Sequence, residues 1–233
     1  MAGVAGVVVE EQRGSAGALH AIDPFADGPV SAPRVWVCVV DRPAIVLGSR
    51  QTPELLDLAA CERAGLEIVR RRSGGGAVLL RPGAMDWIDL VLPREVVPDD
   101  IRSSMTWAGA CWTDAFVELG AAAGDLHLHD GGMVCSPWSN LVCFAGVGPG
   151  EVLVGERKLL GLSQRRSRNG VRIQCQVYRR RIIGEMPPLF ATTVPDVPPA
   201  EPAILADVGL GDVTVAALGA TLADVLGRHI VTG

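Results

Sequence analysis

The stretch RRRSGGGAV at residues 70–78 lies between two short segments, Glu67–Arg71 and Ala77–Leu80, that have the composition of β-strands. Three consecutive glycines let the backbone adopt positive φ and approach a ligand closely, and their N–H groups can face an anion or a carbonyl oxygen. The flanking arginines offer planar donors to a phosphate or a carboxylate. The same pattern also fits a β-hairpin with a flexible tip and solvated arginines, so taken alone it indicates a glycine turn.

A second segment, GERKLLGLSQRR at residues 155–166, contains Lys158, the only lysine among 21 basic residues. Arginine does not act as a titratable amine in proteins, whereas a partly buried lysine can lose and regain its proton. Lys158 is therefore a candidate catalytic residue. The alternative from this segment alone is a lysine that happens to remain on a surface turn.

A third segment is the apolar run Leu141–Phe144, in which Cys143 precedes Lys158 by fifteen positions (158 − 143). Most cysteines in such a run are inert core residues, but a nearby ammonium would stabilise a thiolate. Cys175, in the later strand candidate, is the rival reactive thiol. The six cysteines form no CxxC pair, so neither disulfides nor a zinc site is expected.

The rest of the chain alternates short strand patterns with a few helices, which predicts an α+β architecture. Asn169-Gly170 is typical of a tight hairpin turn. Residues 1–34 are expected to form an arm, residues 35–186 one domain, and residues 187–233 a proline-rich linker with a terminal helix packed on that domain. Further strands are predicted at Val35–Val40, Ala44–Leu47, Trp87–Leu92, Leu126–His129, Leu141–Phe144, Val152–Val154, Lys158–Arg165 and Val171–Tyr178, and helices at Thr52–Ala64, Asp99–Leu119 and Val213–Arg228.

Composition excludes several classes of function. The 233 residues are 48% hydrophobic and 20% charged with a net charge of −5, which argues against a nucleic-acid partner. The sequence shows no signal-peptide pattern and no long apolar run, so a soluble, cytoplasmic protein without a membrane partner is expected. His127 and His129 alternate on one strand face, but nothing completes a ligand set, and no metal site is expected.

Taken together, the three segments resemble the catalytic domain shared by lipoate-protein ligases, octanoyltransferases and biotin-protein ligases. RRRSGGGAV is similar to the lipoate-ligase glycine motif, GERKLLGLSQRR to the family's lysine segment, and residues 45–51, IVLGSRQ, to its earlier strand and turn. The resemblance spans roughly residues 35–180. It implies a biotin/lipoate protein ligase-like fold, with a central mixed or antiparallel sheet packed with helices.

The resemblance also implies roles for individual residues. Lys158 would polarise the activated acyl group, and Cys143 lies where the cysteine-dependent octanoyltransferases carry their nucleophile. Gly161, Ser163 and Gln164 belong to the lysine segment and would contact the substrate. An apolar tunnel with residues such as Val78 and Val91 would measure the acyl chain. The pocket for the carbonyl end of the acyl group would be lined by Arg72, Ser73, Gly74, Gly75, Gly76 and Ala77.

The implied reaction moves an octanoyl or lipoyl group from an acyl carrier protein, or from a lipoylated donor protein, through Cys143. The acceptor would be a lysine of the lipoyl domain of a 2-oxoacid dehydrogenase or of the glycine cleavage H protein. That transferase needs no cofactor. The alternative is a lipoate-protein ligase that uses ATP and Mg²⁺, and a second alternative is a protein that binds acyl groups or carriers without catalysis.

Two positions depart from the family pattern. Leu79, Leu80 and Arg81 occupy the place where many members carry a histidine soon after the glycines. The run Ile173–Val177 occupies the place of a common His-Gly pair. These departures make the geometry of the substrate site and catalysis itself the open points. Biotin attachment is the weaker interpretation, because the Gly-Arg-Gly-Arg-rich loop of biotin enzymes is absent.

Overall fold

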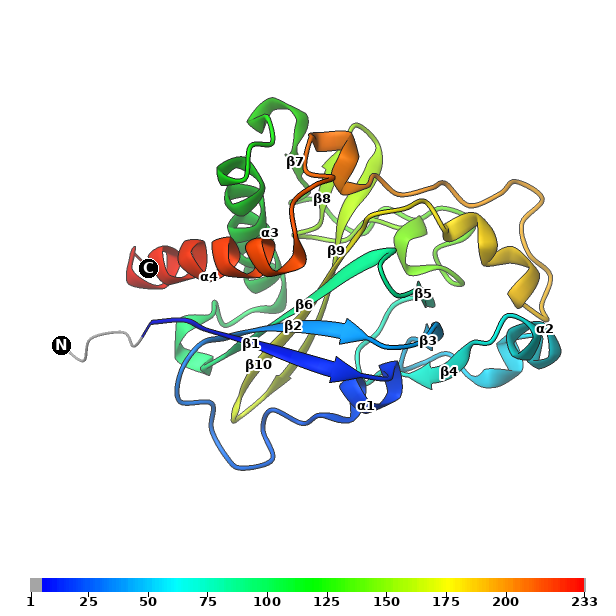
Figure 1. The fold of residues 1–233 in the computed structure, drawn as a ribbon, viewed down its shortest axis with the longest axis horizontal. Helices are drawn as coiled ribbons and strands as arrows, with labels where there is room; N and C mark the ends of the chain where they lie inside the picture. The colour runs from blue at the N-terminus through cyan, green and yellow to red at the C-terminus, as the bar shows by residue number, and fades with distance from the viewer. Residues whose placement is uncertain (1–5, 233) are drawn as a thin grey trace.

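The computed structural model describes residues 6–232 and is built on a seven-stranded mixed sheet in the order β1-β2-β6-β10-β9-β8-β7 (Figure 1). β1 and β2 run parallel, and each other neighbouring pair is antiparallel. The predicted hairpin around Asn169-Gly170 joins β9 to β10 at the centre of this sheet. The strands are β1 (Val8–Gly14), β2 (Arg34–Val40), β6 (Met85–Leu92), β7 (His127–Leu128), β8 (Val152–Val154), β9 (Arg157–Ser167) and β10 (Gly170–Tyr178).

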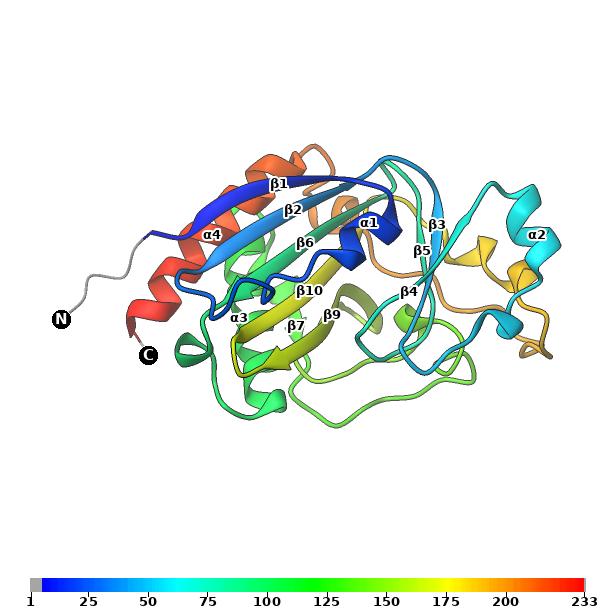
Figure 2. The ribbon, with the colours of Figure 1, turned by 90° about the horizontal axis from the view of Figure 1, so that it is seen from below.

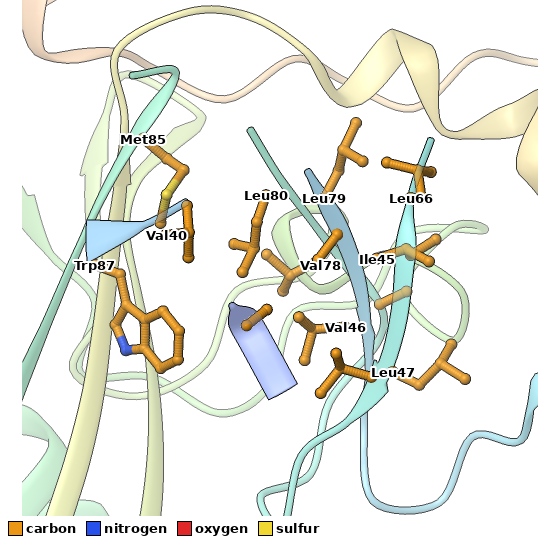
Figure 3. Close-up of a cluster of buried hydrophobic side chains, with 14 of the residues drawn as sticks. Val40, Ile45, Val46, Leu47, Leu66, Val78, Leu79, Leu80, Met85 and Trp87 are labelled. Carbon is orange, nitrogen blue, oxygen red and sulfur yellow. The ribbon is translucent and has the colours of Figure 1, made fainter. Parts of the chain in front are cut away.

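A second, three-stranded sheet consists of β4 (Glu67–Arg70), β3 (Ala44–Leu47) and β5 (Val78–Leu80), with β3 in the middle. Figure 3 shows Val46, Val78 and Leu80 of this sheet reaching toward Trp87 and Met85 of β6. Each such apolar side chain contributes about 1.5–3 kcal/mol when fully buried. The shared core therefore holds the two sheets in a fixed relation, and the glycine stretch between β4 and β5 is held with them.

Two long helices, α3 (Ile101–Glu118) and α4 (Val215–Thr232), cover the opposite face of the large sheet (Figure 2). Asp100 begins α3 as its cap: its Oδ1 accepts a hydrogen bond from the Ser103 N–H at 2.9 Å. Trp112 and Phe116 lie four positions apart on α3 and are fully buried against the sheet. The predicted helices in these two regions are thus confirmed, α4 extending beyond the expected end.

The remaining helices are short. α1 (Ala16–Ala21) follows β1, and α2 (Leu58–Arg63) precedes β4. The single-turn 3₁₀ helices are η1 (Pro53–Leu55), η2 (Arg94–Val96), η3 (Ala123–Asp125), η4 (Cys143–Ala145), η5 (Ile183–Glu185), η6 (Pro187–Leu189) and η7 (Leu205–Val208). In the described part of the chain, no helix is both long and apolar enough to cross a membrane.

The helix predicted over residues 52–64 is interrupted. Leu56 is extended and forms an antiparallel bridge with Phe190, which divides the segment into η1 and α2. Asp57 then caps α2 by accepting from the Ala60 N–H at 2.9 Å. Proline at the first helical position starts a helical turn, but it cannot indicate that a distant chain segment will pair with residue 56.

The N-terminal stretch also differs from the predicted arm. Val8–Gly14 forms β1, which pairs along its whole length with β2, and Ser15 then caps α1. Residues 1–5 lie outside the described residues. The many glycine, proline, alanine and serine residues of this region predicted an arm. β1 instead forms by pairing with a parallel strand, and a parallel partner lies far along the chain.

The strand predicted over Leu141–Phe144 is wrong. Val142 makes a single parallel bridge to Ala77, and Cys143–Ala145 then turns into η4. Apolar residues occur here because the loop is buried against the core, and periodicity cannot distinguish such a loop from a short strand. The predicted α+β class is confirmed, with a mixed sheet packed by helices.

Candidate active site

A cleft opens between the two sheets where the glycine stretch, η4 and the start of β9 meet. Its outer part has a volume of about 500 Å³ and is lined by Gly74–Gly76, Lys158 and residues of the loop before β8. Its inner part is a narrow pocket of about 50 Å³ with apolar walls from Val46, Val78, Leu80, Trp87, Phe144 and Leu162. Cys143, Leu162 and Ser163 line both parts, so the cysteine lies at their junction.

Two glycines of the glycine loop, residues 73–77, stand where another residue would be strained or would clash. Gly75 has a φ of +97°, and a Cβ on Gly76 would lie 2.7–2.8 Å from backbone atoms of Val142 and Cys143. None of the three glycine N–H groups donates a hydrogen bond within residues 6–232. The loop therefore packs its backbone directly against the Cys143 segment at the cleft.

A glutamine fixes the relation between these loops. Gln51 accepts from the Gly48 N–H at 3.0 Å and donates from Nε2 to the carbonyls of Asn140 and Leu141 at 2.9 and 3.2 Å. The turn after β3, which contains Gly48 and Gln51, also bonds the glycine loop through the Ser49 N–H and the Ser73 carbonyl, at 2.9 Å. The motif of residues 45–51 thus joins the glycine loop and the Cys143 segment to the small sheet.

Lys158 is buried at the start of β9. Its Nζ lies 2.7 Å from Glu151 Oε2 and donates to the Cys143 backbone carbonyl at 3.0 Å, and it lies 5.2 Å from the centre of the Phe144 ring. Glu151 is also buried and accepts from the N–H groups of Gly148 and Leu162 at 2.7 and 3.1 Å. Two of the three Lys158 donors are thereby engaged, and the ammonium is held at the wall of the cleft.

Cys143 is half-buried and its sulfur faces a different cation. Arg71 Nη2 donates to Cys143 Sγ at 3.9 Å, whereas Lys158 reaches only the backbone carbonyl of Cys143. Arg71 also donates to the carbonyls of Gly74, Gly76 and Val46, with its shortest contact 2.7 Å to Gly74. Arg71 is 5% exposed, so the guanidinium forms part of the floor beneath the glycine loop.

The other residues predicted for the site fall into two groups. Ser73 is buried and bonds Ser163 Oγ and Gln174 Oε1, both at 3.1 Å. Gly161 lines the inner pocket, where its missing side chain leaves room for the Phe144 ring. Ala77 is buried below the loop, and its amide and carbonyl bond the Leu141–Cys143 segment.

Arg72 lies away from the predicted pocket, whereas Gln164 lines its outer part. The exposed Arg72 guanidinium forms an ion pair with Asp23 at 2.9 Å and lines neither part of the cleft. Gln164 lies at the outer cleft with its amide bonded to Ser104 of α3 at 2.8 Å. Val78 lines the inner pocket, but Val91 is part of the core away from it.

Arg71, Glu151 and His20 were not predicted. A two-residue alternation could have indicated Arg71, because Val69, Arg71 and Ser73 are buried while Arg70 and Arg72 are exposed. His20 enters the inner pocket from α1, its ring 4.5 Å from that of Trp87. Nothing in the sequence around Glu151 indicates its pairing with Lys158.

The pocket keeps His20 uncharged. Burial, and then the charges of Arg172 and Arg71, lower the pKa of His20 to about 3. Its Nδ1 lies 3.3 Å from Gln174 Nε2, so the amide donates to the ring and the ring proton is assigned to Nε2. The family histidine is absent at Leu79–Arg81, and this chain instead brings a neutral imidazole to the pocket from its N-terminal region.

Comparison with known proteins identifies the family. Residues 26–178, more than half of the chain, match the family model of the lipoyl protein ligase A/B catalytic domain. The chain belongs to this family of enzymes. A comparison with curated proteins found no significant sequence match.

Solved structures show the same lipoyl ligase fold. Protein Ta0514 of T. acidophilum, solved with bound lipoic acid, is 17% identical with a TM-score of 0.70, over 96% of this chain and 85% of that one. A lipoate-protein ligase A bound with ATP is 16% identical with a TM-score of 0.72, over 96% and 84% of the two chains. A bipartite lipoate protein ligase of T. acidophilum, studied with its E2 lipoyl domain, is 16% identical with a TM-score of 0.71, over 96% and 82%. The predicted biotin/lipoate ligase-like fold is thus confirmed.

No group of three or more metal-ligating side chains occurs within residues 6–232. The five cysteines other than Cys143 differ from it in position: four are buried and Cys135 is exposed. Burial raises the pKa of the Cys175 thiol well above its ordinary value, and its Sγ bonds the Ile173 carbonyl. Among the cysteines of this lipoyl ligase fold, Cys143 is therefore the one that is partly exposed at the cleft and has a cation, Arg71, beside its sulfur.

Proposed function

We propose that this chain is a protein acyltransferase of lipoate metabolism, which carries an octanoyl or lipoyl group as a thioester on Cys143. The observation that supports this most is the position of Cys143 Sγ, at the junction of the two parts of the cleft and beside the glycine loop. A nucleophile in that position can reach an acyl carbonyl whose chain lies in the inner pocket. Geometry is the first requirement for such a reaction.

The reaction has two balanced steps. The Cys143 thiolate attacks the thioester carbon of an acylated carrier, the bond from Sγ to carbon forms, and the carrier leaves as a thiolate that takes a proton from solvent. The amine of a lipoyl-domain lysine then attacks the same carbon, and the bond to Sγ breaks. The amine proton passes to solvent, the electron pair of the broken bond stays on sulfur, and Cys143 returns to its starting thiolate.

The charge that develops on the carbonyl oxygen in each step needs nearby donors. Gly74, Gly75 and Gly76 line the cleft, and their N–H groups have no partner within residues 6–232. Lys158 retains one donor after bonding Glu151 and the Cys143 carbonyl. Fixed donors of this kind typically account for two to three orders of magnitude in rate, about 2.7–4 kcal/mol each. Lys158 thus acts here as a charged donor, held in place by Glu151.

The acyl chain would enter the inner pocket, which has a volume of about 50 Å³ in this structure and would widen to hold the whole chain. Its apolar wall includes Val78, Leu80 and Trp87, and each methylene buried there contributes about 0.8 kcal/mol. The pocket also carries polar groups, His20 and Gln174, on one side. The acceptor is proposed to be the lipoyl domain of a 2-oxoacid dehydrogenase or the glycine cleavage H protein, a proposal supported by the related ligase that was studied with its E2 lipoyl domain.

The second candidate is an ATP-dependent lipoate-protein ligase, favoured by the structural likeness to a ligase bound with ATP. The outer cleft is large enough for a nucleotide fragment. Its acidic lining residue, Glu151, is already engaged by Lys158, Gly148 and Leu162, so the lining residues as they stand provide no free carboxylate for Mg²⁺. This favours a thioester donor.

The two candidates separate in one transfer assay. A lipoyl domain is incubated with the protein and either octanoyl carrier protein without ATP, or octanoate with ATP and Mg²⁺, and its mass is measured. The proposal predicts octanoylation from the thioester alone, lost in Cys143→Ala. Modification that requires free acid and ATP, or acyl-carrier binding with no modification under either condition, would overturn it.

A further inference from the structure

Among the described residues, the buried charges are paired with one exception. The described charged residues that are at most 6% exposed are Arg71, Asp86, Asp89, Glu151, Lys158 and Arg172. Glu151 pairs with Lys158, Asp89 with Arg172, and Asp86 with the partly buried Arg179. Arg71 pairs with no carboxylate anywhere in residues 6–232. A buried guanidinium is therefore left with an uncompensated positive charge.

The carbonyl contacts of Arg71 satisfy its N–H groups but do not balance its charge. The oxygens of Val46, Gly74 and Gly76 lie 2.7–3.3 Å from its nitrogens and carry only partial charge. An unpaired buried charge is costly, and proteins usually supply an anion or a ligand beside it. Its field is also felt nearby, since Arg71 contributes to the lowered pKa of His20.

One group able to become an anion lies within reach. Cys143 Sγ is 3.9 Å from Arg71 Nη2, and the two groups meet across Gly75. A Cβ at Gly75 would lie 2.9 Å from Arg71 Nη2 and 3.3 Å from Cys143 Sγ, so the glycine leaves the space in which they approach. Lys158, whose charge is balanced by Glu151, contacts the carbonyl of Cys143 instead.

We infer that Arg71 is the counter-cation of a Cys143 thiolate and therefore a catalytic residue, a role that rests on the proposed function of Cys143. The pair completes the charge balance of the site: Lys158 with Glu151, and Arg71 with the thiolate. Acylation removes the negative charge from sulfur. The amine attack returns that charge to the sulfur, again beside the Arg71 guanidinium. Arg71 thus favours both the attacking and the leaving form of Cys143.

The first test uses the unmodified protein. The ultraviolet absorbance of thiolate is compared between the wild type and Cys143→Ser across a pH series, so that the difference reports Cys143 alone. An unassisted cysteine is only a few per cent thiolate at neutral pH. The inference expects a clear thiolate signal from Cys143 at neutral pH. A signal that grows in only at alkaline pH would overturn it, whatever happens to any variant.

The second test compares neighbouring arginines. Alkylation of Cys143 by iodoacetamide is followed at neutral pH in a Cys135→Ser background, which removes the exposed thiol. Arg71→Gln should slow alkylation by about tenfold or more, because it returns the sulfur to the few per cent of an ordinary thiol. Arg71→Lys should recover part of the rate, and its pH profile should lie between those of the wild type and Arg71→Gln. Arg72→Gln, one residue along but bonded to Asp23 at the surface, should match the background protein.

The outcomes separate this inference from the proposed function. If octanoyl transfer passes through Cys143 while Arg71→Gln alkylates at the background rate, the role of Arg71 is overturned and the transferase stands. If Arg71→Gln instead weakens binding of free octanoate without changing Cys143 reactivity, Arg71 holds a substrate carboxylate, which also contradicts the inference. If the Cys143 thiolate depends on Arg71 but the protein accepts no acyl thioester, the charge pairing is supported and the proposed transferase function is contradicted.

Discussion

The buried pair of Lys158 and Glu151 permits a sharp prediction on stability. Their side chains are 2% and 6% exposed, and Nζ lies 2.7 Å from Oε2. Lys158→Met removes the ammonium and leaves the carboxylate buried without a counter-charge, which costs about 3–5 kcal/mol. In a chain of this size, 1 kcal/mol shifts the melting temperature by about 2–4 °C, so a fall of roughly 6–20 °C is expected.

The assay is urea unfolding of three proteins: Lys158→Met, Glu151→Gln and the double variant. The double variant removes both charges, so it should lose clearly less stability than the sum of the single variants. Arg13→Met serves as the control, because Arg13 and Glu11 form an ion pair whose side chains are 62% and 57% exposed. That change should cost at most about 1 kcal/mol. A loss below about 1 kcal/mol in Lys158→Met, or simple additivity in the double variant, would refute the buried-pair argument.

Three further predictions test other parts of the site. Because the pKa of His20 falls to about 3 in the folded state, only the unfolded chain binds this proton below about pH 6.5, and stability is lost as pH falls. Between about pH 6.5 and 3, the unfolding free energy of the wild type should fall by about 1.4 kcal/mol per pH unit relative to that of His20→Gln. Equal slopes for the two proteins would contradict this. Gly76→Ala should lower the free energy of unfolding in urea by about 1–3 kcal/mol, because its Cβ would meet the backbone of Val142. A Cβ on Gly74 meets nothing within 4 Å, so an equal loss in Gly74→Ala would contradict this reason. Val78→Phe should fill the inner pocket and shift the preferred acyl chain to shorter lengths in a competition between hexanoyl and octanoyl carriers, and an unchanged preference would place the chain elsewhere.

Local sequence patterns predicted most of the elements that hold the site. The strands around Ala44–Leu47 and Gly170–Tyr178 follow from apolar runs bounded by turns, and α3 from its helical spacing with a capping aspartate. What failed depends on partners distant in the chain. β1 is set by its pairing with β2, and the break at Leu56 is set by the bridge to Phe190. Neither pairing can be inferred from the residues adjacent in the sequence.

The residues of the site also divide into those that local sequence indicates and those that only tertiary contacts bring together. The glycine loop and Lys158 stand out in the sequence by residue type, whereas Cys143 is a candidate because of the resemblance to the family. The choice between Arg71 and Arg72 depends on which face of the extended chain is buried, and the alternation that decides it continues past the end of β4. Glu151 and His20 reach the site through tertiary contacts alone, from the loop before β8 and from α1.

The central claim is that Cys143 carries the acyl group. It is tested most directly by weighing the intact protein after incubation with octanoyl carrier protein in the absence of ATP, alongside Cys143→Ala and a Cys175→Ala control. The account predicts one octanoyl adduct on the wild type and on Cys175→Ala, and none on Cys143→Ala. An adduct that persists in Cys143→Ala, or a wild-type protein that remains unmodified while it octanoylates lipoyl domains from octanoate and ATP, would contradict it.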